Sequence, residues 1–149
     1  MKNLETEITI NANSKEVWNV LMDHQEYPKW NPFIKHISGN TTKGANMKVT
    51  IQPEGKEPMN FTPIVLRNDK EKEFRWLGHL FVKGLFDGEH YFQLEDMGSN
   101  QTRFVHGENF SGLMAGVLMK MIGENTKKGF HAMNVTLKER IENNKSLEK

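Results

Sequence analysis

Hydrophobic and polar residues alternate along most of the chain, which is the pattern of half-buried β-strands. The first predicted strand covers residues 4–10, where Leu4, Ile8 and Ile10 share one face. Turn-forming residues, mainly Gly, Pro, Asn and Asp, separate the later strands and favour an antiparallel meander. These later strands are predicted at residues 34–39, 45–52, 59–68, 73–80, 88–95 and 102–109.

A helical period replaces this alternation at two places. Asn13 or the serine after it can cap a short helix, and Glu16 follows Asn13 at the spacing of a capping box. Two prolines flanking residues 29–31 then predict an aromatic-rich loop or a single turn. From Met114 to about Glu142, apolar residues recur every three or four positions and predict a long amphipathic helix.

Together these elements predict an α+β fold. One curved antiparallel sheet is expected to wrap around the long C-terminal helix, with short helices after the first strand. We expect one domain over residues 1–149, with a frayed tail from about residue 144. The pattern contains no internal repeat and no linker to a second domain.

The composition is that of a domain whose stability depends on a packed core. Hydrophobic residues make up 36% of the chain and cysteine is absent, which excludes disulfides, thiolate zinc sites and cysteine nucleophiles. Twenty Lys and Arg against nineteen Asp and Glu leave a net charge of +1, so we expect no nucleic-acid partner. No apolar run spans a bilayer and no signal-peptide core is visible, so we expect a cytoplasmic protein without stable membrane insertion.

Short segments spread over nearly the whole chain carry a resemblance to a known family. They are residues 14–18 (SKEVW), 27–34 (YPKWNPFI), 74–78 (FRWLG), 88–92 (GEHYF), 102–104 (TRF), 106–108 (HGE), 110–113 (FSGL), 129–134 (GFHAMN) and 137–138 (LK). These segments resemble the SRPBCC group, the START-like or Bet v 1-like superfamily, and in particular its polyketide cyclase and dehydratase relatives.

The resemblance implies a helix-grip fold with a binding cavity. In such a fold a seven-stranded antiparallel sheet curls around the C-terminal helix and leaves a deep, mostly apolar chamber. The group includes lipid carriers, hormone and secondary-metabolite binders and cyclases, so the fold does not choose among these functions.

Strand periodicity predicts which residues face this cavity. In strands 73–80, 88–95 and 102–109 the more aromatic face should be the inner one, and a slip of one residue would reverse the assignment. Methionines of the long helix should line the other side, because thioether side chains adapt to ligands of varied shape. The candidate ligand-binding residues are Trp30, Phe33, Phe61, Phe74, Trp76, His90, Phe92, Phe104, His106, Glu108, Met114, Leu118, Met121 and Met133.

Three of these candidates are titratable: His90, His106 and Glu108. A buried carboxylate is costly without a partner, so Glu108 should be paired, protonated or wetted by cavity water. The three side chains either form a structural hydrogen-bond cluster or anchor the polar end of a ligand. They could also bind a divalent metal, but their spacing matches no compact ligand set, and we expect neither a metal nor a cofactor.

Three functions stay open from the sequence. The leading one is a carrier or binding protein for a hydrophobic small molecule such as a lipid, polyketide or aromatic metabolite. The alternative is a cyclase- or dehydratase-type enzyme in which His90 or His106 moves a proton and Glu108 orients or polarises it. A protein-interaction module, as in chaperone-binding relatives, would need an exposed apolar patch on the outer sheet face. Both a monomer and a homodimer are compatible with the sequence.

Overall fold

The computed structural model describes residues 2–80 and 82–147, and within them the strands and helices follow the predicted order. In chain order the elements are β1 (Lys2–Ile10), α1 (Ser14–Leu21), the 3-10 helix η1 (His24–Glu26), α2 (Tyr27–Trp30), β2 (Ile34–Gly39), β3 (Met47–Ile51), β4 (Met59–Phe61), β5 (Ile64–Asp69), β6 (Glu73–Leu80), β7 (Phe86–Gly98), β8 (Gln101–Ser111) and α3 (Ala115–Leu147). The α+β prediction is therefore confirmed.

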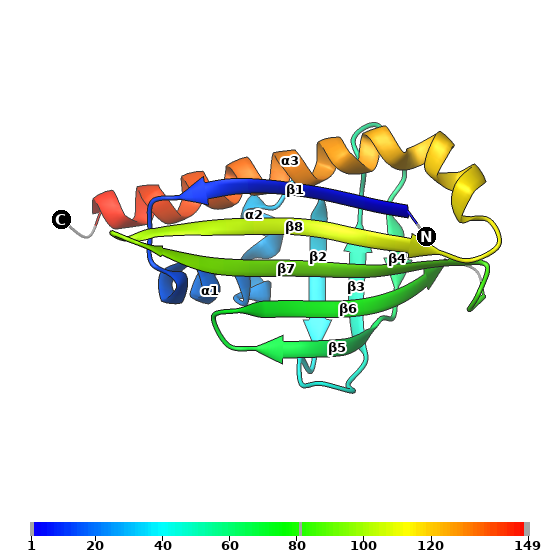
Figure 1. Ribbon diagram of the computed structural model, residues 1–149, viewed down its shortest axis with the longest axis horizontal. Coiled ribbons are helices and arrows are strands. Elements are labelled where there is room, and N and C mark those ends of the chain that lie inside the picture. The colour runs from blue at the N-terminus through cyan, green and yellow to red at the C-terminus, as the bar shows by residue number, and fades with distance from the viewer. Residues whose placement is uncertain (1, 81, 148–149) are drawn as a thin grey trace.

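The strands form two antiparallel sheets (Figure 1). One has the order β1-β8-β7-β6-β5, and the other has the order β2-β3-β4 and runs crosswise behind it. Backbone hydrogen bonds join their edges: the Met47 N–H donates to the Pro63 carbonyl, and the Val65 N–H donates to the Ala45 carbonyl. The two sheets consequently make one curved surface.

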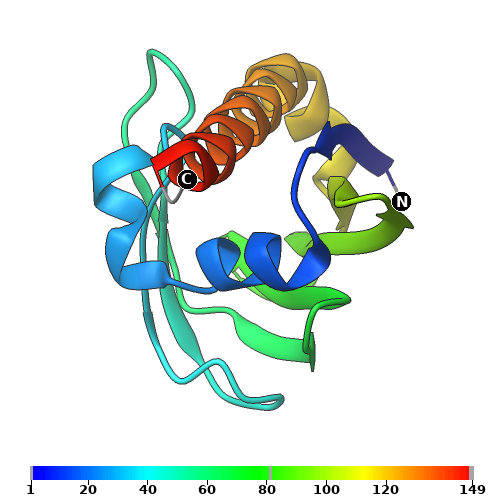
Figure 2. The same cartoon turned by 90° about the vertical axis from the view of Figure 1, so that its left-hand side faces the viewer.

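Helix α3 lies in the hollow of this surface, which is the helix-grip arrangement (Figure 2). It packs on β1, β7 and β8 and also contacts α1 and α2. Phe130, Met133 and Leu137 come from its buried side and are fully inaccessible to solvent. They pack with aromatic residues of the sheet such as Phe74 and Phe92, and this contact forms the main core.

The short elements after β1 form as the capping and proline signals predict. The side chain of Asn13 caps α1 by accepting a hydrogen bond from the Glu16 N–H at 2.9 Å. Helix α2 is the single turn expected beside the prolines. Directly after it, the Asn31 side chain accepts hydrogen bonds from the Phe33 and Ile34 N–H groups, which turns the chain into β2.

Two boundaries differ from the predictions. Residues 59–68 form two strands instead of one, because Pro63 has no N–H for the ladder and lies where the chain passes between the sheets. The fold thus has eight strands in two sheets, not about seven in one. Helix α3 continues to Leu147, so residues 144–147 of the expected tail are helical, and residues 148–149 lie outside the described residues.

Candidate functional site

Alternate side chains of β6, β7 and β8 point inward and form one wall of the interior. Trp76, His90 and Glu108 are direct cross-strand neighbours on these three strands. Phe92 and His106 form the next such pair along β7 and β8. His90, Phe92 and His106 have no exposed surface, so the predicted inner face is confirmed.

A cavity of about 60 Å³ lies between this wall, strands β3 and β4, and helix α3. Gly78 and Gly88 face each other on β6 and β7 and leave part of the wall without side chains. Glu108 is the one ionisable side chain among the described residues that line it. The aromatic side chains in the wall are Phe33, Phe61, Trp76, Phe86 and Phe110.

The structure brings only some of the predicted site residues to this cavity. Four line it: Phe33, Phe61, Trp76 and Glu108. His90 and His106 lie one layer deeper, behind Glu108. Phe74, Phe92, Phe104 and Met133 are buried in the main core instead, and the partly buried Leu118 packs against a second cluster around Phe86 and Phe110.

Three further candidates, Met121, Met114 and Trp30, do not line the cavity either. Met121 is 70% exposed and Met114 is 37% exposed, so both point away from the interior. The α3 side chains in the cavity wall are Ile122 and Thr126, one helical turn apart. The apolar pattern at the start of α3 runs around the whole helix and therefore did not distinguish its two sides. Trp30 is half-buried and packs at the edge of the main core without lining the cavity.

A continuous chain of hydrogen bonds leads from the cavity wall into the core. Glu108 Oε1 is 3.2 Å from His90 Nδ1, and His90 Nε2 is 2.8 Å from His106 Nε2. His106 Nδ1 is 2.9 Å from Asn134 Oδ1, and the Asn134 side-chain amide donates to Thr6 Oγ1 at 2.8 Å. The Thr6 hydroxyl in turn donates to the His106 carbonyl at 3.0 Å. We call these five residues the inner chain.

Counting donors along the inner chain determines its direction. The Thr6 hydroxyl has one hydrogen, which the His106 carbonyl accepts, so Asn134 must donate its N–H to Thr6 and offer its Oδ1 to His106. His106 then carries its proton on Nδ1 and accepts at Nε2, so His90 donates from Nε2. His90 Nδ1 is left as an acceptor, and a protonated Glu108 is the donor that satisfies it.

The reverse direction lacks one hydrogen. Asn134 would present its oxygen to Thr6, and the single Thr6 hydrogen would have to serve both that oxygen and the His106 carbonyl. The hydrogen count therefore favours the direction that starts at Glu108.

The pKa shifts of the titratable groups agree with an uncharged inner chain. Burial raises the pKa of Glu108 to about 8 and lowers the pKa of His90 to about 3. Burial, with a smaller contribution from His90, also holds the pKa of His106 well below its ordinary value. All three groups are therefore uncharged near pH 7. The His90 ring stacks on Trp76 at 4.6 Å and the His106 ring stacks on Phe130 at 4.1 Å, which fixes both imidazoles between aromatic surfaces.

Sequence reasoning missed three positions that build this site. A Cβ at Gly88 would overlap Glu108 Oε2, so the missing side chain is what gives the carboxyl its place. A glycine inside a strand is a known sign of such a close approach. Asn134 and Thr6 complete the inner chain, and Asn134 was visible as a polar residue between Phe130 and Leu137 on the buried side of the long helix.

The metal alternative has no geometric basis here. His90 and His106 direct their Nε2 atoms at each other at 2.8 Å, which is hydrogen-bond distance. Over residues 2–80 and 82–147, no group of three or more His, Asp or Glu side chains is placed to hold a metal ion.

Among the helices in these ranges, none is long and apolar enough to cross a bilayer.

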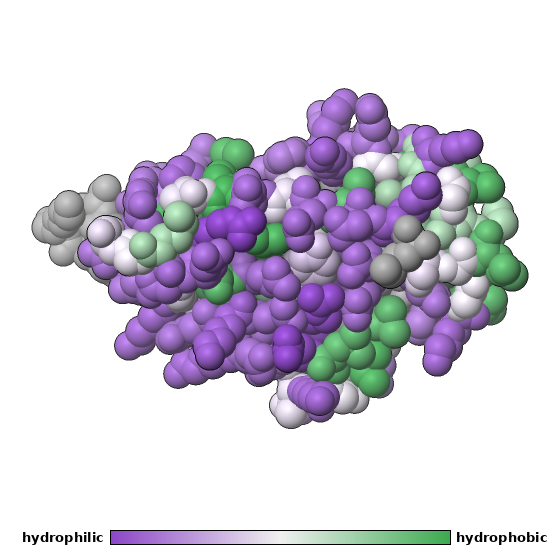
Figure 3. Space-filling model, in the orientation of Figure 1, coloured by the Kyte–Doolittle hydropathy of each residue, from purple (hydrophilic) through white to green (hydrophobic). Residues whose placement is uncertain are grey.

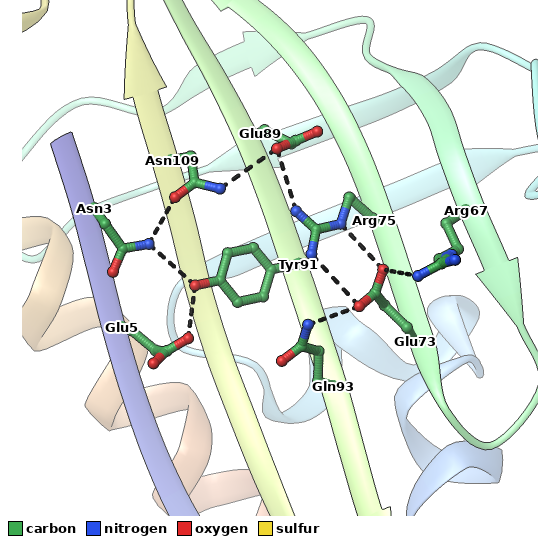
Figure 4. A network of polar contacts seen from close by, with 9 residues as sticks. All are labelled: Asn3, Glu5, Arg67, Glu73, Arg75, Glu89, Tyr91, Gln93 and Asn109. Atoms are coloured by element: carbon green, nitrogen blue, oxygen red, sulfur yellow. Dashed lines mark hydrogen bonds and ion pairs between the residues drawn. The ribbon is translucent and has the colours of Figure 1, made fainter. Parts of the chain in front are cut away.

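The outer face of the same strands carries a second polar network, which we call the outer network (Figure 4). Arg75 lies at its centre, within ion-pair distance of Glu73 and Glu89 and 4.5 Å above the Tyr91 ring. The members are Asn3, Glu5, Arg67, Glu73, Arg75, Glu89, Tyr91, Gln93 and Asn109. This face is mostly hydrophilic in Figure 3, whereas exposed apolar residues such as Leu113 and Val117 gather where α3 begins.

Comparisons with known proteins point to one family. Residues 1–142 match the family model described as polyketide cyclase / dehydrase and lipid transport. The fold is similar to that of the Zhui aromatase/cyclase from Streptomyces sp. R1128, with a TM-score of 0.76, 15% identity, and coverage of 95% of this chain and 93% of that chain. No curated protein sequence matches the chain.

Two further solved structures have the same fold. A point mutant of norcoclaurine synthase from Thalictrum flavum, bound to a transition-state analogue, has a TM-score of 0.73 and 14% identity, with 97% of this chain and 96% of that chain covered. A START superfamily protein from Mycobacterium smegmatis has a TM-score of 0.70 and 16% identity, with 95% and 97% covered. At sequence identities this low, the structural similarity shows that the fold is shared and does not show that any activity is shared.

Proposed function

Because the chain belongs to the polyketide cyclase / dehydrase and lipid transport family, we propose that it binds an apolar small molecule in the cavity beside Glu108. The observation that supports this most strongly is the composition of the cavity wall: mostly aromatic and aliphatic side chains surround a single carboxyl group, and the one hydroxyl, that of Thr126, already donates to the Ile122 carbonyl. Small-molecule sites are commonly built this way, with apolar contacts supplying affinity and one or two polar groups supplying orientation.

The cavity must widen to accept such a guest. Its volume of about 60 Å³ lies well below the roughly 300–1,000 Å³ typical of sites for drug-sized ligands. Met59, Leu80 and Ile122 are half-buried wall residues with rotatable side chains, and they are the groups that would move aside. Our proposal is therefore a binding or carrier protein whose walls close over the cavity when it is empty.

One observation favours an enzyme as the second candidate. The pKa of Glu108, raised to about 8 by burial, lies close to neutral pH, as general acid–base catalysis requires. Such an enzyme of cyclase or dehydratase type would use Glu108 as the group that touches the substrate. His90 and His106 do not line the cavity, so they would act as positioning residues and not as the proton-transferring groups expected from the sequence.

Binding can be tested with small aromatic probes and a variant that fills the cavity. A Cβ at Gly78 would meet its nearest neighbour, Pro63, at an ordinary contact distance of 3.7 Å, so the first carbon of a Gly78→Val side chain fits at the cavity wall and its methyl groups add volume there. Gly116→Val is the matched control, because nothing lies within 4 Å of that position.

Titration with p-cresol and p-xylene, followed by amide NMR shifts, should saturate for the wild type and for Gly116→Val. The shifted amide signals should belong to cavity residues. The apparent affinity of Gly78→Val for both probes should be at least tenfold lower than that of the wild type. Native mass spectrometry of the freshly purified protein would additionally reveal a retained guest. Absence of saturable binding, or equal binding by Gly78→Val, would contradict the proposal.

A further inference from the structure

We propose that the ligand of this cavity is a hydrogen-bond donor: an otherwise apolar molecule whose hydroxyl or N–H group donates to Oε2 of Glu108. This inference rests on the proposed binding function and adds the chemical class of the ligand. It follows from the different hydrogen-bonding of the two carboxyl oxygens of Glu108, Oε1 and Oε2.

The two carboxyl oxygens of Glu108 have different surroundings. Oε1 is bonded to His90 Nδ1 at 3.2 Å and is thereby committed to the inner chain. Oε2 lies against the backbone of Gly88, a residue of the cavity wall, and no other described residue hydrogen-bonds to it. The side chain keeps 14% of its surface accessible, whereas that of His90 keeps none. Oε2 is thus the carboxyl oxygen that is left available to a guest.

The direction of the inner chain makes Oε2 an acceptor. His90 Nδ1 needs a hydrogen, because the His90 proton is already given from Nε2 to His106. Glu108 must therefore carry its proton on Oε1, and Oε2 is left as the carbonyl oxygen of a carboxylic acid. A guest that satisfies this oxygen has to donate.

Ionisation of Glu108 does not change this preference. If the carboxyl loses its proton, or passes it to His90, Oε2 becomes a carboxylate oxygen and still only accepts. The single arrangement that would favour an accepting ligand places the proton on Oε2. That arrangement requires the reverse direction of the inner chain, which lacks one hydrogen at Thr6.

The apolar wall turns this preference into selectivity. Phe110 and Ile122 have no hydrogen-bonding group, and the indole N–H of Trp76 makes no hydrogen bond to Glu108, so a guest without a donor leaves Oε2 unpaired. An unpaired buried acceptor typically weakens binding by about tenfold or more. A phenol or an alcohol should therefore be preferred over a hydrocarbon of the same shape, after correction for hydrophobicity.

The test uses three probes small enough for a narrow cavity. p-Cresol carries a donor, p-xylene replaces its hydroxyl by a methyl group of similar size, and 4-methylanisole keeps the oxygen without its hydrogen. Affinities are measured by NMR titration at pH 7 for the wild type, Glu108→Gln and Glu108→Met. When the ratio of p-cresol affinity to p-xylene affinity is compared between the proteins, the difference in hydrophobicity between the two probes cancels.

Glu108→Gln is the matched control. Its amide N–H can donate to His90 Nδ1, and its amide oxygen can take the place of Oε2, so the arrangement of donors and acceptors is preserved. We expect the p-cresol to p-xylene ratio of Glu108→Gln to stay within about threefold of the wild type. In Glu108→Met, which offers the cavity no comparable acceptor, the ratio should fall about tenfold.

Two results separate this inference from the proposed function. Binding of all three probes with an unchanged ratio in Glu108→Met, or stronger binding of 4-methylanisole than of p-cresol by the wild type, would overturn the donor preference and leave the binding function intact. Failure of all three probes to bind any folded variant would overturn both. Should Glu108→Met not fold, the order of the three probe affinities in the wild type, corrected for the hydrophobicity of each probe, decides the matter: p-cresol first supports the donor preference, and 4-methylanisole or p-xylene first overturns it.

Discussion

The inner and outer faces of the five-stranded sheet solve the problem of buried polar groups in opposite ways. On β7, His90 points inward and belongs to the neutral inner chain, whereas its neighbours Glu89 and Tyr91 point outward into the charged outer network. Both sets run across the same strands. The difference therefore comes from the environment of each face and not from the backbone that carries it.

Carboxyl groups show the contrast most clearly. Glu108 has only a neutral imidazole as its partner, so burial raises its pKa to about 8. Burial also pushes the pKa of Glu73 upward, but hydrogen bonds from Arg75 and Gln93 outweigh this and hold it below its ordinary value. Cations near water stabilise an ionised carboxylate, whereas an apolar interior stabilises the protonated acid.

Among the substitutions compared at one pH, the largest expected effect separates two asparagines on opposite faces. In Asn134→Leu, the His106 Nδ1–H loses its acceptor and Thr6 loses its donor inside the core, which should cost about 1–3 kcal/mol of unfolding free energy. Asn109→Leu removes bonds to Asn3 and Glu89 at a face that water can reach, and should cost about 0.5 kcal/mol or less. Urea unfolding measures both. Equal losses of unfolding free energy in the two variants would show that the inner chain contributes no more to stability than the outer network.

The second prediction concerns pH and the inner face. Glu108 has an ordinary pKa of 4.5 and a folded pKa of about 8, so between these values the folded protein holds a proton that the unfolded chain has released. Its contribution to the unfolding free energy should therefore decrease as the pH rises from about 4.5 to about 8, by at most about 1.4 kcal/mol per pH unit. Unfolding of the wild type and Glu108→Gln across this range should show the two proteins diverging, with Glu108→Gln gaining relative stability.

Glu73 is the matched carboxyl on the outer face, and its sign is opposite. Because its folded pKa is lowered, its stabilising contribution is complete above the ordinary pKa of 4.5 and is lost as the pH falls through the folded value. The difference in stability between the wild type and Glu73→Gln should thus stay constant from pH 5 to pH 8 and shrink in more acidic solution. Parallel pH curves for the two Gln variants would remove the distinction between the faces.

A third prediction concerns the glycine beneath Glu108. Gly88→Ala places a Cβ where Oε2 lies, so the carboxyl must shift and the bond to His90 should lengthen or break. Because the overlapping atom is the end of a flexible side chain, we expect a modest loss of about 1 kcal/mol. The p-cresol affinity should fall several-fold. Gly116→Ala, which meets nothing within 4 Å, should leave both quantities nearly unchanged; a similar loss of probe affinity there would point to a general effect of the substitution.

The smallest effect is expected at the edge of the outer network. Arg67 has 57% of its side chain exposed and pairs with Asp69 and Glu73. Arg67→Met should change the unfolding free energy by about 0–1 kcal/mol, and 1 M salt should remove most of that change by screening. The effect of Asn134→Leu should persist in the same salt. A loss at Arg67 that survives salt would indicate a buried pair instead of a surface one.

The sequence predicted the inner wall well because a period of two is a strong constraint. Once the more aromatic face of each strand was taken as the inner one, Trp76, His90 and Glu108 were all assigned to it, and the structure then shows them as cross-strand neighbours. The helix was harder, since apolar residues surround its first turns and only packing shows that Ile122 faces the cavity and Met121 faces water.

Two other features depend on contacts that no local pattern contains. Thr6 and Asn134 are separated by 128 residues, and their hydrogen bond exists only because α3 packs on β1. The volume of the cavity depends on how Met59, Leu80 and Ile122 pack together, whereas periodicity reports only the direction of each side chain.

The most direct test of the neutral, directed inner chain is the ¹⁵N NMR spectrum of the two buried imidazoles at pH 7. We expect His90 to carry its proton on Nε2 and His106 to carry its proton on Nδ1, each ring with one bare nitrogen, and the ¹³C shift of the Glu108 carboxyl to be that of the protonated acid. A doubly protonated His90 beside an ionised Glu108, or the opposite tautomer of either ring, would contradict it.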